Sequence, residues 1–184
     1  MKSIPLLVAL VLIFPFSSAT AESPPSEANW KSTLEAELPL LGHRNWIVIT
    51  DSAYPLQNSS GIQTVETGAE YFEVVQTVLQ ELSKASHVRP IVFTDAELPF
   101  VPENRAKGIS TLRVQLGEIL KSREVHALPH EQIIGMLDDT GKAFRILVLK
   151  TNLTLPYTSV FLRLDCGYWS AEREKSQCNL GQAW

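Results

Sequence analysis

Cysteine is scarce in this sequence, with two residues in 184, and so is any excess of positive charge. Two cysteines cannot build the dense disulfide framework of a small secreted scaffold. The net charge of −4 and a pI of about 5.6 give no electrostatic reason to expect a nucleic acid partner. Lys and Arg are scattered along the chain, with no run that would mark a phosphate-binding face. The sequence also has no internal repeat, and its length suits one domain.

Long hydrophobic runs are equally rare, and the one at the N-terminus covers Ile4 to Phe16. This run contains two prolines and falls short of the roughly 20 apolar residues that span a bilayer. Lys2 precedes it and the small-residue sequence Ala19-Thr20-Ala21 follows it, as in a signal peptide. We therefore expect residues 1–21 to be removed, leaving a periplasmic or secreted protein with no membrane segment.

The remaining chain divides by composition into a linker over 22–31, a domain over 32–166 and a C-terminal tail over 167–184. A disulfide between Cys166 and Cys178 is favoured by the secretory signal and would tether the tail, whereas two free thiols are the alternative. Neither cysteine lies in a nucleophile motif.

Strands and helices alternate in the hydrophobic pattern of the domain. Short β-branched or apolar runs predict strands at 46–50, 62–65, 90–94, 125–128, 144–149 and 160–164. Three- and four-residue spacing of apolar positions, with a capping box at 32–35, predicts helices at 32–42, 70–85, 103–121 and 130–137. A turn is expected over 138–141. This alternation predicts an α/β fold, a three-layer sandwich with a central, mostly parallel sheet.

The most informative stretch runs from Gly42 to Pro55. Gly42 ends the predicted helix, His43 follows it, and a strand leads to Asp51. Ligands of open α/β sheets bind beyond the carboxyl ends of strands, which makes Asp51 a candidate. Histidine can donate or accept a proton near neutral pH, which makes His43 the candidate general acid or base.

Three motifs, in this order, resemble the ribose pyranase and fucose mutarotase family. They are the Gly-His, Asp and Pro pattern of 42–55, the Pro-His-Glu-Gln sequence of 129–132, and the segments 150–157 and 159–162. The resemblance covers about residues 32–166 and implies a ribose pyranase-like fold. It also implies a homo-oligomer with sites at subunit contacts.

By this resemblance His43 is the catalytic proton donor, and the substrate-binding residues are Asp51, His130, Tyr157, Thr158 and Ser159. The sequence departs from the family where Ser159 replaces an Asn and where Asn152 and Leu153 replace Gly and Glu. Neither a cofactor nor a metal is expected. The His126 and His130 pair has helical metal spacing, but Pro129 makes a shared helix unfavourable.

Each candidate also has a structural interpretation. His43 could cap the carbonyls of a helix end, Asp51 could cap a turn, His130 could belong to a helix N-terminus, and Tyr157 could be a half-buried strand residue. Five strand residues separate His43 from Asp51 by about 16 Å, which one sugar ring cannot bridge. Either the turn at Arg44 folds His43 back toward Asp51, or the two residues serve one site from adjacent subunits.

The favoured hypothesis is an exported, cofactor-free monosaccharide mutarotase or pyranase, an isomerase acting on a sugar such as ribose or fucose. Ring opening and reclosure need one proton donor, one proton acceptor and groups that bind hydroxyls. A non-catalytic carbohydrate-binding protein on the same scaffold is the first alternative, and a structural protein that keeps only the oligomeric ring is the second.

Overall fold

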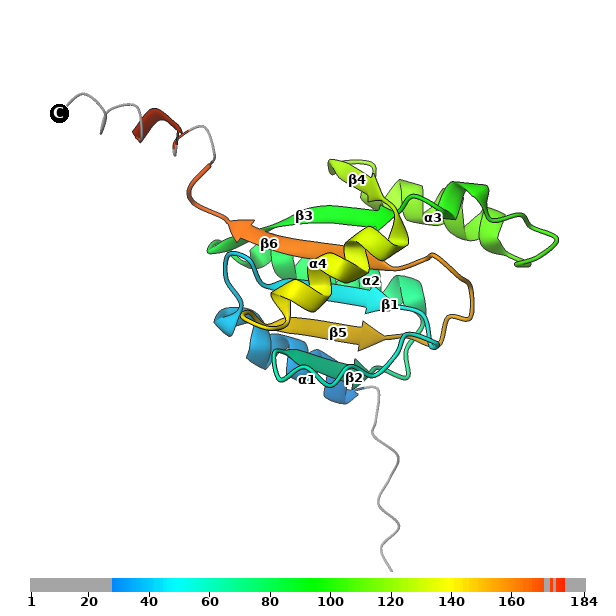
Figure 1. Ribbon diagram of the computed structural model, residues 1–184, viewed down its shortest axis with the longest axis horizontal. Helices are drawn as coiled ribbons and strands as arrows, with labels where there is room; N and C mark the ends of the chain where they lie inside the picture. Colours follow the sequence, from blue (N-terminus) through cyan, green and yellow to red (C-terminus); the bar gives the residue numbers. More distant parts are fainter. Residues whose placement is uncertain (1–27, 171–172, 174, 178–184) are drawn as a thin grey trace, which may run out of the picture.

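The computed structural model describes residues 28–170, 173 and 175–177 (Figure 1). In chain order its elements are α1 (Ala28–Glu37), η1 (Leu38–Leu40), β1 (Trp46–Thr50), β2 (Ile62–Glu66), α2 (Tyr71–Lys84), β3 (Val88–Asp95), η2 (Leu98–Phe100), α3 (Ile109–Leu120), β4 (Val125–Leu128), α4 (His130–Thr140), β5 (Ile146–Lys150) and β6 (Val160–Cys166). The predicted signal peptide over 1–21 lies outside the described residues. In the part of the chain that is described, no helix combines the length and apolar character needed to cross a membrane.

The six strands form one sheet in the order β2-β5-β1-β6-β3-β4. β1 and β2 both pair with β5 in parallel, and β3 pairs with β4 in parallel. β6 is antiparallel to both of its neighbours, β1 and β3. Because β1 and β3 oppose the same strand, all strands except β6 run in one direction. Their carboxyl ends therefore share one edge of the sheet, here called the carboxyl edge, and their starts share the amino edge.

Helices cover both faces of this sheet, which confirms the predicted three-layer α/β fold. Figure 1 shows α4 in front of the sheet and α1, α2 and α3 behind it. The larger core lies behind, where Trp30 of α1 and the apolar faces of α2 and α3 pack on residues such as Ile47 and Ile49. The smaller core lies under α4 and includes Trp46 and Val48. All five residues of β1 are buried, because this strand lies between two covered faces.

Several predicted boundaries are wrong for identifiable reasons. α1 begins at Ala28, so the Ser32–Glu35 sequence lies inside the helix and residues 28–31 are not linker. α3 begins at Ile109 instead of 103, because the Glu103 carboxylate accepts hydrogen bonds from the N–H groups of Gly108 and Ser110 and so caps the helix from outside it. α4 continues to Thr140, through most of the turn expected at 138–141. Capping from a distance leaves little local signal.

Substituting alanine for Gly61 is expected to lower the free energy of unfolding by about 1–3 kcal/mol, because the fold leaves no room for a side chain there. A Cβ atom at Gly61 would lie 2.2 Å from the Gly141 carbonyl oxygen and 2.7 Å from that of Phe144. Urea unfolding measures the loss. Gly117→Ala is the matched control, since Gly117 lies in α3 with open space around it and alanine there should add about 0.5–1 kcal/mol. Equal effects at both positions would contradict the close packing at Gly61.

Candidate functional site

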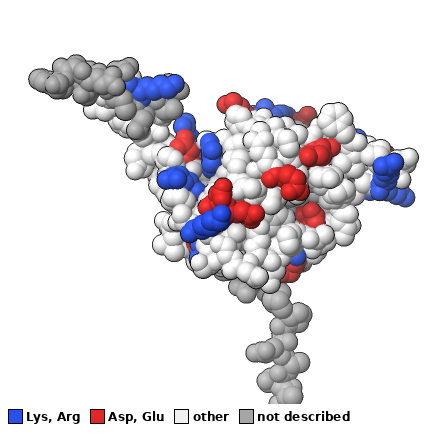
Figure 2. Space-filling model, viewed as in Figure 1, with Lys and Arg blue, Asp and Glu red and all other residues white. Residues whose placement is uncertain are grey.

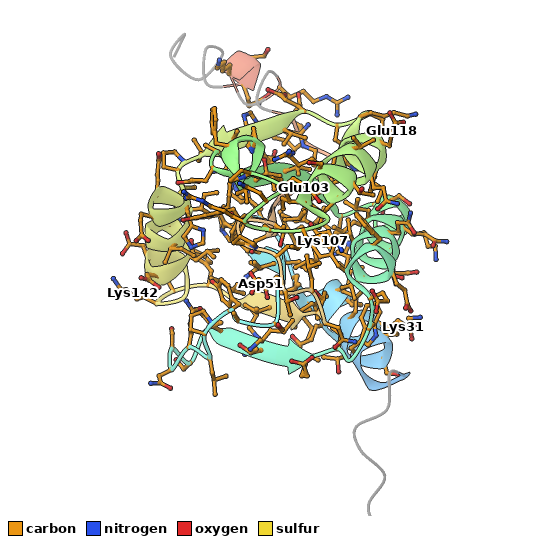
Figure 3. All side chains as sticks on the ribbon, turned by 90° about the vertical axis from the view of Figure 1, so that its right-hand side faces the viewer. Lys31, Asp51, Glu103, Lys107, Glu118 and Lys142 are labelled. Carbon is orange, nitrogen blue, oxygen red and sulfur yellow. The ribbon has the colours of Figure 1, made fainter. Side chains whose placement is uncertain are left out.

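A pocket of about 410 Å³ opens at the carboxyl edge of the sheet. It is lined by Asp51, Ser52, Ala53, Tyr54, Pro55, Asp95, His130, Thr154, Leu155, Pro156, Tyr157 and Ser159. Figure 3 looks onto the side of the molecule that lies at the right in Figure 1, where the strands β1 and β5 end, and shows Asp51 near the middle of it. The volume is within the range of small-molecule sites.

The topology explains why residues distant in sequence meet in this pocket. Asp51 follows β1, Asp95 ends β3, and His130 begins α4 directly after β4. Tyr157 and Ser159 lie in the connection between β5 and β6. Every one of these positions is at the carboxyl edge, the place where α/β sheets bind ligands.

The strongest polar contact in the pocket joins His130 to Asp95. The ring nitrogen Nδ1 of His130 lies 2.9 Å from Oδ1 of Asp95, whose side chain is fully buried. The second carboxylate oxygen, Oδ2, is buried and has no hydrogen-bond partner among the described residues. Both oxygens of Glu97 accept the backbone N–H of His130 at 3.1 Å, which fixes the start of α4. A carboxylate behind an imidazole fixes the orientation of the ring, as in the His-Asp pairs of acid–base catalysts.

Burial raises the pKa of Asp95, and the hydrogen bond from His130 offsets part of that rise. The same pocket raises the pKa of Tyr54 to about 12, first because the phenol is buried and then because Asp138 and Asp95 carry negative charge nearby. A hydrogen bond between the side chains of Tyr54 and Gln57 offsets a small part of that rise. Buried polar groups are rarely left unpaired, so Oδ2 of Asp95 is available to accept a hydrogen bond from a polar ligand in the pocket.

Asp95→Asn is expected to raise the free energy of unfolding at pH 8 by about 1 kcal/mol, because a buried carboxylate is costly. A carboxyl pKa raised by folding means that the folded protein holds the proton more tightly. The loss of folding stability caused by the buried carboxylate is therefore complete above the raised pKa. It disappears as the pH falls toward the ordinary pKa of 3.8. Urea unfolding at pH 8 and pH 5 should show that the difference in the free energy of unfolding between Asp95→Asn and the parent is smaller at pH 5. The exposed Asp138 supplies the control variant Asp138→Asn, and a destabilised Asp95→Asn protein at pH 8 would contradict the argument.

Asp51 combines both interpretations that the sequence allowed. Its Oδ1 atom accepts the backbone N–H of Ala53 at 2.7 Å, so it caps the turn that follows β1. It also lines the pocket. One carboxylate oxygen is thus occupied by the turn, and the residue remains in place to receive a ligand hydroxyl with the other.

Tyr157 and Ser159 reach the pocket, whereas Thr158 does not line it. Tyr157 has a backbone φ of +56°, and its ring meets the His130 ring edge-on with centroids 5.7 Å apart. Thr158 is buried, donates its hydroxyl to the Leu155 carbonyl, and accepts the Tyr71 hydroxyl on its own carbonyl. The assignment of Thr158 to substrate binding is therefore corrected, because its polar groups hold the loop together.

His43 lies at the opposite edge of the sheet from the pocket. It precedes β1, its side chain is 64% exposed, and its Nδ1 atom lies 3.9 Å from Oδ1 of Asp165. The turn at Arg44 does not fold it back toward Asp51, because Arg44 and Asn45 lead directly into β1 beside the end of β6. The structure therefore brings together Asp51, His130, Tyr157 and Ser159 but leaves His43 apart from them within one chain.

Two further sequence predictions concern metals and cysteines. Within the described residues, no three His, Cys, Asp or Glu side chains gather in a way that could hold a metal ion. Cys166 is the last residue of β6 and is half-buried, but Cys178 lies outside the described residues. Their disulfide stays a prediction.

Comparison with solved structures relates this architecture to sugar-binding proteins. The RbsD protein of Bacillus subtilis, solved in complex with D-ribose, is 20% identical over 73% of this chain and 92% of that chain, with a TM-score of 0.52. The fucose mutarotase of Streptococcus pneumoniae, solved with L-fucose, is 19% identical over 72% and 91%, with a TM-score of 0.44. FucU of Bifidobacterium longum is 12% identical over 73% and 94%, with a TM-score of 0.47. No protein-family model and no curated protein matches the chain. The likeness to RbsD confirms the predicted ribose pyranase-like fold.

Proposed function

We propose that this chain is an exported monosaccharide mutarotase or pyranase of the ribose pyranase and fucose mutarotase family, working without a cofactor. The observation that carries the proposal is the pocket itself. Three residues picked out in the sequence by resemblance, Asp51, His130 and Tyr157, line one cavity together with a buried carboxylate, Asp95. The fold around them is that of RbsD, a protein solved with D-ribose bound.

The chemistry requires a proton to leave one oxygen of the sugar and another to arrive at a second oxygen. When the anomeric hydroxyl loses its proton, the bond between the anomeric carbon and the ring oxygen breaks and the ring oxygen takes up a proton. Reclosure of the open aldehyde reverses these transfers and gives the other anomer or another ring size. In our proposal His130, backed by Asp95, handles one of the two protons, and Asp51 binds a sugar hydroxyl. Tyr157 and Ser159 hold the sugar ring.

The other proton in this proposal is supplied by His43 of an adjacent copy of the chain, which acts as the proton donor while His130 acts as the acceptor. His43 is exposed at the amino edge, so a neighbour packed edge to edge can present it to the pocket. This arrangement resolves the separation of His43 and Asp51 without any change in the chain itself. It also makes the active form a homo-oligomer, and the N-terminal signal peptide would place that oligomer in the periplasm or outside the cell.

The experiment is NMR of ribose and fucose with and without the protein. Magnetisation exchange between anomers and between ring forms should be faster with the protein present than in buffer alone. Line broadening of the sugar signals reports binding independently of exchange. Neither binding nor faster exchange with either sugar would contradict the proposal.

A non-catalytic carbohydrate-binding protein is the second candidate, and the positions of Asn152 and Leu153 favour it. The Asn152 side chain donates to the Gly68 carbonyl, and Leu153 packs against the larger core. Neither lines the pocket, and Leu153 supplies no counterpart to the carboxylate that the family pattern has at its position. Sugar binding without faster exchange would identify this function.

A further inference from the structure

A second and larger cleft, of about 790 Å³, opens at the amino edge of the sheet. Its floor comes from the starts of β1 and β3 and the end of β6, and its wall from the end of α4 and the turn before β5. We call it the arginine cleft because it is lined by Arg44, Arg89 and Arg163. His43 also lines it, so in the proposed homo-oligomer the cleft lies beside the contact with the neighbouring copy. Figure 2 shows Lys and Arg side chains near the end of β6, with Asp and Glu side chains among them.

The sheet register brings these arginines together from distant parts of the sequence. Arg89 pairs with Asp165 across β3 and β6, and Arg163 pairs with Trp46 across β6 and β1. The Arg44 backbone N–H donates to the Leu164 carbonyl at 2.9 Å, which places Arg44 beside the same part of β6. A chain with a net charge of −4 thus concentrates three guanidinium groups in one concave surface.

Two of the three arginines are held by aromatic rings and have no acidic partner. The guanidinium carbon of Arg44 lies 4.2 Å from the centre of the Phe144 ring, and that of Arg163 lies 5.3 Å from the Phe93 ring. Neither forms an ion pair or a side-chain hydrogen bond with any residue that the structure describes. Stacking restricts a guanidinium without using its N–H donors, so both groups are pre-arranged for a ligand.

The carboxylates that line the cleft are already neutralised by other cations. Asp165 accepts hydrogen bonds from Nε and Nη2 of Arg89 at 3.1 and 2.6 Å. Asp139 pairs with Lys142 at 2.8 Å. The guanidinium groups of Arg44 and Arg163 are therefore left without an acidic partner among the described residues.

The backbone at Arg44 adds an independent observation. Its φ is +78°, a left-handed conformation that residues other than glycine rarely adopt. Among the described residues, the other non-glycine residue with positive φ is Tyr157, in the sugar pocket. Strained side chains persist where a function needs them, and glycine at this position would have been more favourable for folding alone.

We propose that the arginine cleft binds a phosphate monoester, with its phosphate group between Arg44 and Arg163. A phosphate monoester carries a charge of about −1.5 to −2 at pH 7, which matches the two unpaired guanidinium groups. An arginine guanidinium can bind two phosphate oxygens with two parallel hydrogen bonds. This charged, bidentate interaction is stronger than a single hydrogen bond between neutral groups. The cleft is far larger than one phosphate ion, and Trp46 and Phe144 line it beside the arginines, so the organic part of the ester also has a surface to contact.

The test is isothermal titration of the intact protein with ribose 5-phosphate, inorganic phosphate, acetate and ribose, in the absence of any other ligand. Ribose 5-phosphate should bind more tightly than inorganic phosphate, and both should bind more tightly than acetate. Binding should weaken as salt is added, because the contacts are between charges. This readout needs no sugar exchange, so its failure and the failure of the proposed isomerase activity are separate results.

Two variants locate the site and one serves as the matched control. Arg163→Met and Arg44→Gly should each weaken ribose 5-phosphate binding by about ten-fold or more. Arg44→Gly also suits the positive φ, so it should unfold at the same or a higher urea concentration than the parent protein. Arg145→Met is the control, since Arg145 lies next to Phe144 in sequence but pairs with Glu37 and Gln63 and does not line the cleft.

The proposal is overturned if neither phosphate nor its ester binds, or if all three variants bind ribose 5-phosphate as the parent does. It is also overturned if the parent binds no phosphate and Arg163→Met changes the oligomeric state, measured as the mass of the oligomer in solution. That result would show that the arginines meet carboxylates of another copy of the chain.

Discussion

Replacing His130 by asparagine is expected to slow sugar exchange by about 10²–10⁴-fold while leaving sugar binding nearly unchanged. The imidazole of His130 lies 2.9 Å from the buried Asp95 carboxylate and lines the pocket, so the proposed function gives it the proton transfer. Asparagine keeps a polar side chain that can still donate toward Asp95, but it cannot take up and release a proton. Magnetisation exchange between ribose anomers measures the rate, and line broadening measures binding.

His126→Asn is the matched control for this experiment. His126 lies on β4, four residues before His130, and contacts Phe93 and Glu124 outside the pocket. The control should exchange sugar at the parental rate. Parental exchange in His130→Asn would remove the imidazole from the chemistry, and an equal loss in both variants would indicate damage to the β4 and α4 region instead of lost proton transfer.

Much of the fold follows from local pattern. β1 was predicted with its observed bounds because all five of its residues are buried, and an uninterrupted apolar run is the signature of such a strand. The carboxyl edge could be predicted in the same way, since the residues after parallel strands must meet. That rule singled out Asp51, whereas His130 was chosen only by its resemblance to the family motif. Applied to Thr94-Asp95, it would also have found Asp95, which ends β3 as Asp51 follows β1.

The remaining features depend on contacts between distant segments. β6 inserts between β1 and β3, and this register alone places Arg163 beside Arg89 and Arg44. The sequence shows three scattered basic residues there, and no run of Lys and Arg along the chain indicates that they line one cleft. His43 illustrates the same limit. Its separation from Asp51 by eight residues does not show whether the two side chains serve one site within a chain or a site between two copies.

Mixing two inactive variants of this protein is expected to restore activity, because each proposed site takes His43 from one copy and the pocket from the next. His43→Ala alone should lose about 10²-fold or more in sugar exchange, since the proton donor is missing. His130→Asn alone should also lose activity, because its own pocket lacks the imidazole. When the two are co-expressed and assemble at random, about one quarter of the sites receive an intact His43 and an intact pocket. Exchange should therefore recover to about one quarter of the parental rate per site.

The control for this prediction is the double variant that carries both His43→Ala and His130→Asn. It is co-expressed with the parent chain and with each single variant, and the exchange rates are compared with that of the two single variants together. If each site were built from one chain, every site in a mixture of the two single variants would lack either His43 or His130, so mixing them would restore nothing. Recovery from the two single variants requires that the groups come from different copies, because no chain in that mixture carries both. His43 lies at the amino edge with its side chain 64% exposed, which leaves it free to reach the carboxyl edge of a neighbour. If the two single variants form stable mixed oligomers but sugar exchange does not recover, His43 does not act in a neighbour's pocket and belongs to the arginine cleft alone. The proton donor would then have to be Tyr54, Asp51 or Tyr157, which line the pocket.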